Sequence, residues 1–198
     1  MKCAAWLLVL GGAVLAGAWW GPANVRAADE KGDKGTRVTI DGLTSVAPAE
    51  WKEEEPPEIS RRMRYKQFRL PKVEGDKQDT ELIIFFFGTG AGGSAAENVK
   101  RWKDFFIPPK GKKIDDVAKV EKMKVGDVPV TYLDVEGTYK YKAAPFVPDS
   151  RAELRPDYRM VGVVFESKKG PYYFRLVGPA KTVAHYKKGF DQFLKGFK

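Results

Sequence analysis

The residues Gly88 to Gly93 match the spacing of a known phosphate-binding motif. They satisfy the pattern G-x-G-x-x-G, and they lie between a predicted strand at Leu82–Phe87 and a predicted helix. A dinucleotide-binding loop has this setting, because backbone N–H groups at the start of the helix can hold phosphate. The match is weak evidence here, since a glycine-rich run of small residues satisfies several such patterns by composition alone.

The start of the following helix argues against an anion in this loop. Ser94-Ala95-Ala96-Glu97 is a capping box, in which Ser94 accepts a hydrogen bond from a first-turn amide and Glu97 reaches back. Glu97 also places a negative charge where a phosphate would lie, and the loop has no lysine. We therefore expect a plain strand-to-helix connection. The alternative is a small-ligand or nucleotide-binding protein, or an enzyme, that uses Gly88–Gly93.

Basic side chains form the second candidate site. Arg61, Arg62, Arg64 and Lys66 are clustered and predict a surface that binds an anionic partner. Basic residues at a sheet edge also prevent aggregation, and that interpretation fits this cluster equally well. Smaller basic groups occur at Lys110, Lys112, Lys113, Lys187 and Lys188.

The remaining reactive residues do not combine into a chemical site. The chain has one histidine, His185, and one cysteine, Cys3, which cannot form the usual zinc or iron sites. The carboxylates of Asp115-Asp116 and Glu53–Glu55 lie in polar contexts, whereas an acid–base pair needs one member in a desolvating pocket. Ser94 lacks the G-x-S-x-G setting of a hydrolase nucleophile. We predict no catalytic residue, metal or cofactor, and hence no enzyme.

The first 27 residues have the order of a secretory signal peptide, with Lys2, an uncharged run and small residues before a polar stretch. Val25-Arg26-Ala27 fits the cleavage rule, which leaves a flexible leader at 28–36. Losing Lys2 and Arg26 lowers the formal charge of +9 by two, to +7. The expected location is periplasmic or extracellular. An uncleaved membrane anchor is the alternative, because Cys3–Trp20 contains 18 uncharged residues.

The predicted elements alternate between hairpins and two amphipathic helices. Hairpins are predicted around Asp41-Gly42, around Gly126-Asp127 and around Lys168–Pro171. A further strand, from Met63 to Leu70, changes phase across Lys66-Gln67, which predicts a β-bulge there.

The apolar run Leu82–Phe87 predicts a central strand covered on both faces. Two rows of apolar residues at helical spacing predict the helices. They are Val99, Trp102, Phe105 and Phe106, and then Val183, Tyr186, Phe190, Phe193, Leu194 and Phe197. The fold class is α+β, with an antiparallel sheet of about six strands and helices on both faces.

Several stretches resemble exported bacterial proteins of unknown function related to the PsbP family, whose fold is shared with the yeast Ran-binding Mog protein. The resemblance implies a single domain over 37–198, an α/β/α sandwich, no known catalytic residues, and work in protein association. The matching stretches are Pro48–Trp51, Lys66–Pro71, Leu82–Ser94, Val128–Thr131, Gly137–Tyr139 and Tyr172–Pro179.

These observations predict an exported, non-catalytic accessory or binding domain. Its partner is expected to be a protein or an anionic component of the cell envelope, contacted through the polar, proline-punctuated segment 142–157 or a basic face. Nucleic acid is not expected outside the cytoplasm. Membrane association is expected only if the N-terminal segment is retained, and the sequence does not predict the oligomeric state.

Overall fold

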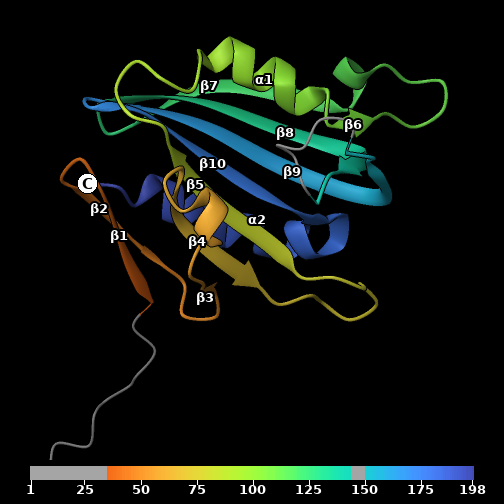
Figure 1. The fold of residues 1–198 in the computed structure, drawn as a ribbon, viewed down its shortest axis with the longest axis horizontal. Helices are drawn as coiled ribbons and strands as arrows, with labels where there is room; N and C mark the ends of the chain where they lie inside the picture. Colours follow the sequence, from red (N-terminus) through yellow and green to blue (C-terminus); the bar gives the residue numbers. More distant parts are fainter. Residues whose placement is uncertain (1–34, 144–149) are drawn as a thin grey trace, which may run out of the picture. The chain divides into compact units, whose positions relative to one another are not determined.

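A computed structural model describes residues 35–143 and 150–198, which build an antiparallel sheet with two α-helices (Figure 1). The predicted signal peptide and almost all of the predicted leader lie outside these ranges, as do residues 144–149 of the predicted loop. Neither α-helix in the two ranges combines the length and apolar character needed to cross a bilayer.

The order of elements along the chain is mostly strand. The helices are α1 (Ala95–Lys103) and α2 (Ala180–Lys195), with short 3-10 helices η1 (Glu58–Ser60) and η2 (Ile114–Asp116). The strands are β1 (Thr36–Ile40), β2 (Leu43–Ala47), β3 (Lys52–Glu53), β4 (Arg64–Leu70), β5 (Thr80–Phe86), β6 (Phe106–Ile107), β7 (Ala118–Val125), β8 (Val128–Tyr141), β9 (Glu153–Ser167) and β10 (Gly170–Pro179).

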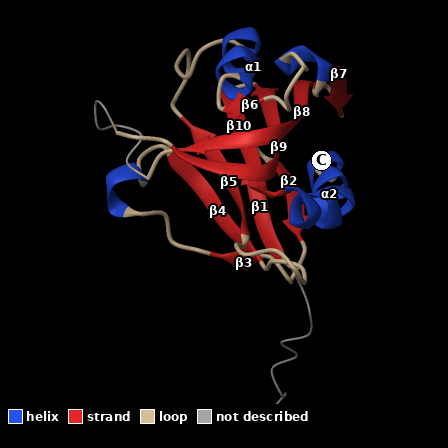
Figure 2. Ribbon diagram, turned by 90° about the vertical axis from the view of Figure 1, so that its right-hand side faces the viewer, coloured by secondary structure: helices blue, strands red, loops and turns tan. Residues whose placement is uncertain are grey.

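The main sheet is larger than the sequence predicted. It has eight strands, in the order β3-β4-β5-β10-β9-β8-β6, with β7 also paired to β8 (Figure 2). β8 is long enough, at 14 residues, for β7 and β6 to share its outer edge. The expected count of about six was therefore wrong, because the two-residue strands β3 and β6 leave no periodicity in the sequence.

β1 and β2 form a separate hairpin, as the sequence predicted. Asp41 and Gly42 have φ angles of 48° and 88°, which suits the tight turn of a two-residue hairpin. The hairpin contacts α2 and the C-terminus: Ser45 donates to the carbonyl of Phe193 at 2.6 Å, and the amide of Thr44 donates to the carbonyl of Lys198 at 2.9 Å.

The two faces of the sheet carry two separate apolar cores. Along β9, Val161 and Val163 belong to the core that includes α2, whereas Met160 and Val164 belong to the core that includes α1. Successive side chains of a strand point to opposite faces, so the two cores lie on opposite sides of the sheet. We call these sides the α2 face and the α1 face.

α2 covers its face with the apolar row that the sequence predicted. Every predicted member of that row is buried, and Phe193 packs edge-on to Phe174 and Phe197 at centroid distances of 6.3 and 5.3 Å. Pro179 precedes the helix, where its missing N–H costs no hydrogen bond.

The α1 face carries one short helix of nine residues, which packs Val99 and Trp102 into the core on that side. Trp102 lies directly over Gly162 of β9, where an added Cβ would come within 2.5 Å of the indole ring. The protein is thus mainly antiparallel sheet with two helices. The α/β/α sandwich expected from the sequence is not confirmed.

Two predicted boundaries were wrong. Phe105 and Phe106 were assigned to the first helix, but the helix ends at Lys103, and Phe106 joins β6 because the edge of β8 offers it hydrogen bonds. The predicted irregular segment 142–157 is shorter, since β9 already begins at Glu153. Pro156 is tolerated in that strand because it is unpaired on both sides. The register between β8 and β9 shifts there, passing from Tyr158 to Arg155, and β10 ends opposite Tyr158.

Thr80 provides a stability prediction. Its side chain is fully buried, and its hydroxyl has no hydrogen-bond partner among the described residues. Thr80→Val keeps the shape and removes the unpaired hydroxyl, so we expect the free energy of unfolding to rise by about 1 kcal/mol in urea denaturation.

A matched control is Thr182→Val, at another fully buried threonine. The Thr182 hydroxyl donates to Asp76 at 2.6 Å and accepts from the amide of Val73 at 3.2 Å. This change should lower the free energy of unfolding by about 1–3 kcal/mol, because it leaves buried polar groups without a hydrogen-bond partner. Shifts of the same sign in both variants would contradict the assignment.

Candidate functional site

A groove of about 1510 Å³ crosses the α1 face at the end of the sheet away from β7. β4, β5 and β10 form its floor, the ends of β8 and β9 form one wall, and Arg101 of α1 lies at its rim. Charged and aromatic side chains dominate its lining. We call it the polar groove.

A β-bulge decides which basic side chains enter the groove. The register of β4 against β5 shifts between Arg64 and Lys66, so the predicted bulge is confirmed, slightly earlier than expected. Arg64 donates to Gln67 at 2.5 Å on the groove side. Tyr65 instead packs edge-on to Tyr172, which belongs to the α2-side core, with ring centroids 5.3 Å apart.

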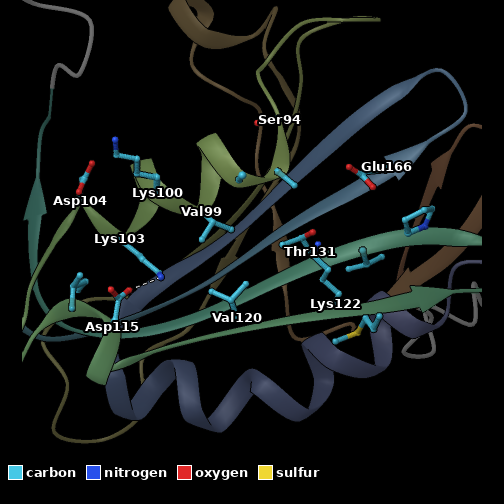
Figure 3. A pocket seen from close by; sticks show the side chains of 16 residues that line it. Ser94, Val99, Lys100, Lys103, Asp104, Asp115, Val120, Lys122, Thr131 and Glu166 are labelled. Atoms are coloured by element: carbon cyan, nitrogen blue, oxygen red, sulfur yellow. Dashed lines mark hydrogen bonds and ion pairs between the residues drawn. The ribbon is translucent and has the colours of Figure 1, made fainter.

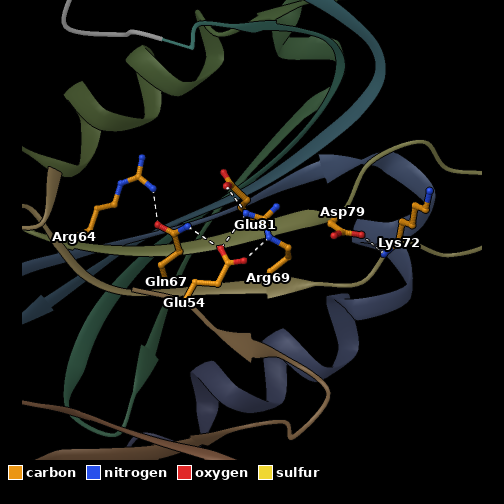
Figure 4. A network of polar contacts seen from close by, with 7 residues as sticks. All are labelled: Glu54, Arg64, Gln67, Arg69, Lys72, Asp79 and Glu81. Carbon is orange, nitrogen blue, oxygen red and sulfur yellow. Dashed lines mark hydrogen bonds and ion pairs between the residues drawn. The ribbon is translucent and has the colours of Figure 1, made fainter. Parts of the chain in front are cut away.

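The centre of the groove is a network of paired charges (Figure 4). Arg69 binds Glu54 through two hydrogen bonds of 2.5 and 2.9 Å, and it lies 3.6 Å from the carboxylate of Glu81. The Gln67 amide also donates to Glu54 at 3.1 Å. The hydrogen bond from Arg69 lowers the pKa of Glu54, which keeps this carboxylate ionised.

Two arginines in the groove have a nitrogen that is left without a partner within residues 35–143 and 150–198. The guanidinium of Arg175 lies over the ring of Phe85, at 5.2 Å from its centroid. The Nε atoms of Arg64 and Arg175 are buried and have no partner among the described residues. Partial burial lowers the pKa of Arg64, the charge of Arg175 lowers it further, and Glu81 opposes both.

Tyrosines form the wall opposite this network. The guanidinium of Arg155 lies 3.5 Å from the ring centroid of Tyr141 and pairs with Glu153 at 3.0 Å. Tyr139 and Tyr158 are stacked, with centroids 5.8 Å apart. Burial raises the pKa of Tyr158, so its hydroxyl stays protonated at neutral pH.

The four basic residues that the sequence singled out line one smaller pocket of about 370 Å³, together with the acidic run Glu53–Glu55. Lys66 forms an ion pair with Glu53 there, and of the four only Arg64 also enters the polar groove. Sequence reasoning missed Arg175. Its signal was a lone charge in the otherwise apolar strand Tyr172–Val177.

Side chains of the protein itself bind the backbone of the glycine loop Gly88–Gly93. The predicted capping box is confirmed, with the amide of Ser94 donating to Glu97 at 2.7 Å. Asn98 donates to the carbonyl of Gly92 at 2.9 Å, and the hydroxyl of Tyr173 donates to that of Gly93 at 2.7 Å. Gly92 has φ of 90°, and a Cβ there would meet the ring of Tyr173 at 2.6 Å. Gly92 therefore allows a close packing of the backbone on an aromatic ring.

A second hollow, of about 940 Å³, lies between α1 and the strands β7 and β8 (Figure 3). Val99 of α1 and Val120 of β7, which is 44% exposed, form part of its lining. At one end Lys103 binds Asp115 at 2.7 Å. The side chain of Asp115 is 74% exposed, which is the setting of a solvated ion pair.

The other chemistry-bearing residues stay apart. His185 is exposed on α2, with its ring edge-on to Tyr186 at 4.7 Å. Within the described ranges, no three His, Cys, Asp or Glu side chains converge in a way that could hold a metal ion.

Comparison with known proteins rests on structure alone. No family model and no curated protein matches the sequence. The structure is similar to cyanobacterial PsbP (CyanoP) from Synechocystis sp. PCC 6803, with a TM-score of 0.51 and 13% identity over 90% of this chain and 99% of that one. A Pseudomonas aeruginosa protein of unknown function aligns with a TM-score of 0.41 and 12% identity over 81% of this chain and 93% of that one.

The first similarity establishes the fold, and the resemblance inferred from the sequence is confirmed at that level. The chain has a PsbP-like fold. At 13% identity this similarity assigns no functional residue, because one fold supports many functions.

Proposed function

We propose that this chain is an exported, non-catalytic binding domain that receives a segment of a partner protein in the polar groove. The observation that carries the proposal is the groove lining, in which arginines and tyrosines face a concavity large enough for several side chains. Arginine and tyrosine are the residues most often found at the energetic centres of protein interfaces.

The mixed charge of the groove favours a protein over an anionic envelope polymer. Glu54, Asp79 and Glu81 line it together with the arginines. A polyanion would bring many negative charges close to these carboxylates, and that repulsion is unfavourable. A protein segment can instead present one acidic group among neutral and basic neighbours.

In-cell photo-crosslinking of the full-length chain tests this function. A photoreactive side chain at Lys142, exposed at the groove rim, should give a protein adduct. The same group at Lys188, exposed on α2, is the matched control and should give none. The association that this adduct reports should persist in moderate salt, because contacts inside a groove are less screened than exposed charges.

Three results would overturn the proposal: an adduct from the Lys188 position alone, a glycan or lipid adduct from the Lys142 position, or no adduct from either. Mass spectrometry of the same material tests export, since a processed chain should begin at Ala28.

The alternative function at Gly88–Gly93 has its own measurement. Millimolar ADP or NAD is expected to leave the unfolding midpoint of the chain unchanged, because a ligand that binds the folded state must stabilise it. A concentration-dependent rise would support the alternative instead.

A further inference from the structure

We infer that Arg64 and Arg175 together bind one carboxylate, supplied by an aspartate or glutamate side chain of the partner. The inference rests on the proposed function and specifies the group that the polar groove recognises. The sequence pattern identified Arg64 but not Arg175.

The sheet register brings the two arginines to one site. Ile83 of β5 pairs with Gln67 of β4 on one side and with Arg175 of β10 on the other. These residues share one face, two strand spacings apart, or about 9–10 Å between their backbones. Arg64 extends along β4 to donate to Gln67 at 2.5 Å, which brings its guanidinium to the row of Arg175.

The charge balance at this point is incomplete. The only side-chain partner of Arg64 is the neutral Gln67, and Arg175 has no polar partner among the described residues. Glu81 is the carboxylate whose charge acts on Arg64 most strongly, but it also lies against Arg69. Two partly buried like charges repel each other, and a carboxylate that binds their terminal nitrogens would relieve this repulsion.

The neighbours of the two arginines hold them in position. Gln67 is 4% exposed and is fixed by its own hydrogen bond to Glu54 at 3.1 Å, so it orients Arg64. Phe85 lies under the guanidinium of Arg175 at 5.2 Å. An arginine held this way loses little side-chain entropy when it binds an anion.

The shape and charge of the surroundings select a carboxylate. Glu54 and Glu81 lie beside the site, and their repulsion of a doubly charged group offsets the stronger attraction that the two arginines exert on it. A planar carboxylate can also accept parallel hydrogen bonds from a guanidinium. Phosphate and sulfate should therefore bind more weakly than acetate.

The first test uses the full chain and sodium acetate, with sodium chloride at equal ionic strength as reference. The Nε–H groups of Arg64 and Arg175 are buried, which favours their detection by ¹H–¹⁵N NMR near neutral pH. We expect both signals to shift saturably with millimolar acetate and to respond less to phosphate. In Arg64→Gln, the acetate response of Arg175 should weaken about tenfold.

Arg61→Gln/Arg62→Gln is the matched control, because it removes two exposed arginines from the same sequence cluster. That variant should leave both acetate responses unchanged. Failure of acetate to saturate either signal, or tighter binding of phosphate than of acetate, would overturn the inference.

The second test separates this inference from the proposed function. Arg64→Gln/Arg175→Gln should lower the yield of the Lys142 adduct at least about tenfold. The unfolding midpoint should change little, because the variant removes the repulsion between the two arginines together with the attraction of Glu81 for Arg64. An unchanged adduct would overturn the carboxylate site while the proposed function stands. Saturable acetate binding without any Lys142 adduct would sustain the site and overturn the function.

Discussion

Trp102→Ala is expected to lower the free energy of unfolding by about 3–5 kcal/mol, the largest loss from any single change considered for this chain. Trp102 is 5% exposed, and its ring lies over the backbone of Gly162 at the centre of the sheet. α1 has only nine residues, too few to be helical without packing. Urea denaturation followed by far-UV circular dichroism measures the loss.

Gly162→Ala completes a double-mutant cycle with Trp102→Ala, and its effect on the free energy of unfolding should change sign between the two backgrounds. In the unaltered protein, Gly162→Ala should cost about 1–3 kcal/mol, because its Cβ would lie 2.5 Å from the Trp102 ring. In the Trp102→Ala background, Gly162→Ala should instead raise the free energy of unfolding by about 0.5–1 kcal/mol, since alanine restricts the unfolded chain more than glycine does. Equal effects in both backgrounds would contradict this packing.

Gly189→Ala is the matched control for this cycle. Gly189 lies inside α2, and an added Cβ would meet Pro48 and Trp51 at an ordinary 3.8 Å. This change should raise the free energy of unfolding by about 0.5–1 kcal/mol with or without Trp102.

Asp134→Asn is expected to lower the free energy of unfolding by about 2–3 kcal/mol. Asp134 accepts two hydrogen bonds from Arg159, at 2.8 and 2.7 Å, and the two side chains are only 15% and 18% exposed. Asparagine leaves a partly buried guanidinium without its main counter-ion. Glu136, whose carboxylate lies 3.1 Å from Arg159, still compensates part of the arginine charge. The loss of unfolding free energy should therefore be smaller than for a fully buried pair.

An exposed ion pair is the control for this prediction. Asp115→Asn breaks the pair with Lys103, in which the Asp115 side chain is 74% exposed. Its cost should be below about 1 kcal/mol and should shrink further in salt, whereas the Asp134→Asn cost should persist. Equal costs at high salt would mean that the burial of Asp134 and Arg159 has no energetic consequence.

Local sequence patterns predicted those structural features that depend on one short stretch of chain. The hairpin turn at Asp41-Gly42, the capping box at Ser94–Glu97 and the apolar face of α2 were all predicted and found. Each depends on backbone preference or on side-chain spacing within one element, so neighbouring residues contain the information.

The candidate site was predicted only in part. Arg64 was identified by its place in a basic cluster, but its neighbours Arg61 and Arg62 lie outside the polar groove. Arg69 lies further along the same strand as Arg64, whereas Arg175 enters the groove from β10. Pairing between β4, β5 and β10 brings these residues together over about 100 positions of sequence, a separation that short-range patterns do not encode.

By itself, the sequence determined the longer strands, the two helices with their inward faces and the PsbP-like resemblance, because spacing along one element fixes which residues are apolar together. Only the tertiary structure decided that a bulge at Tyr65 turns Arg64 toward Arg175. It also decided that carboxylates pair with Arg69, whereas none within the described ranges pairs with the other two arginines. The physical reason is that charge compensation depends on distances between strands, which the register sets and composition does not.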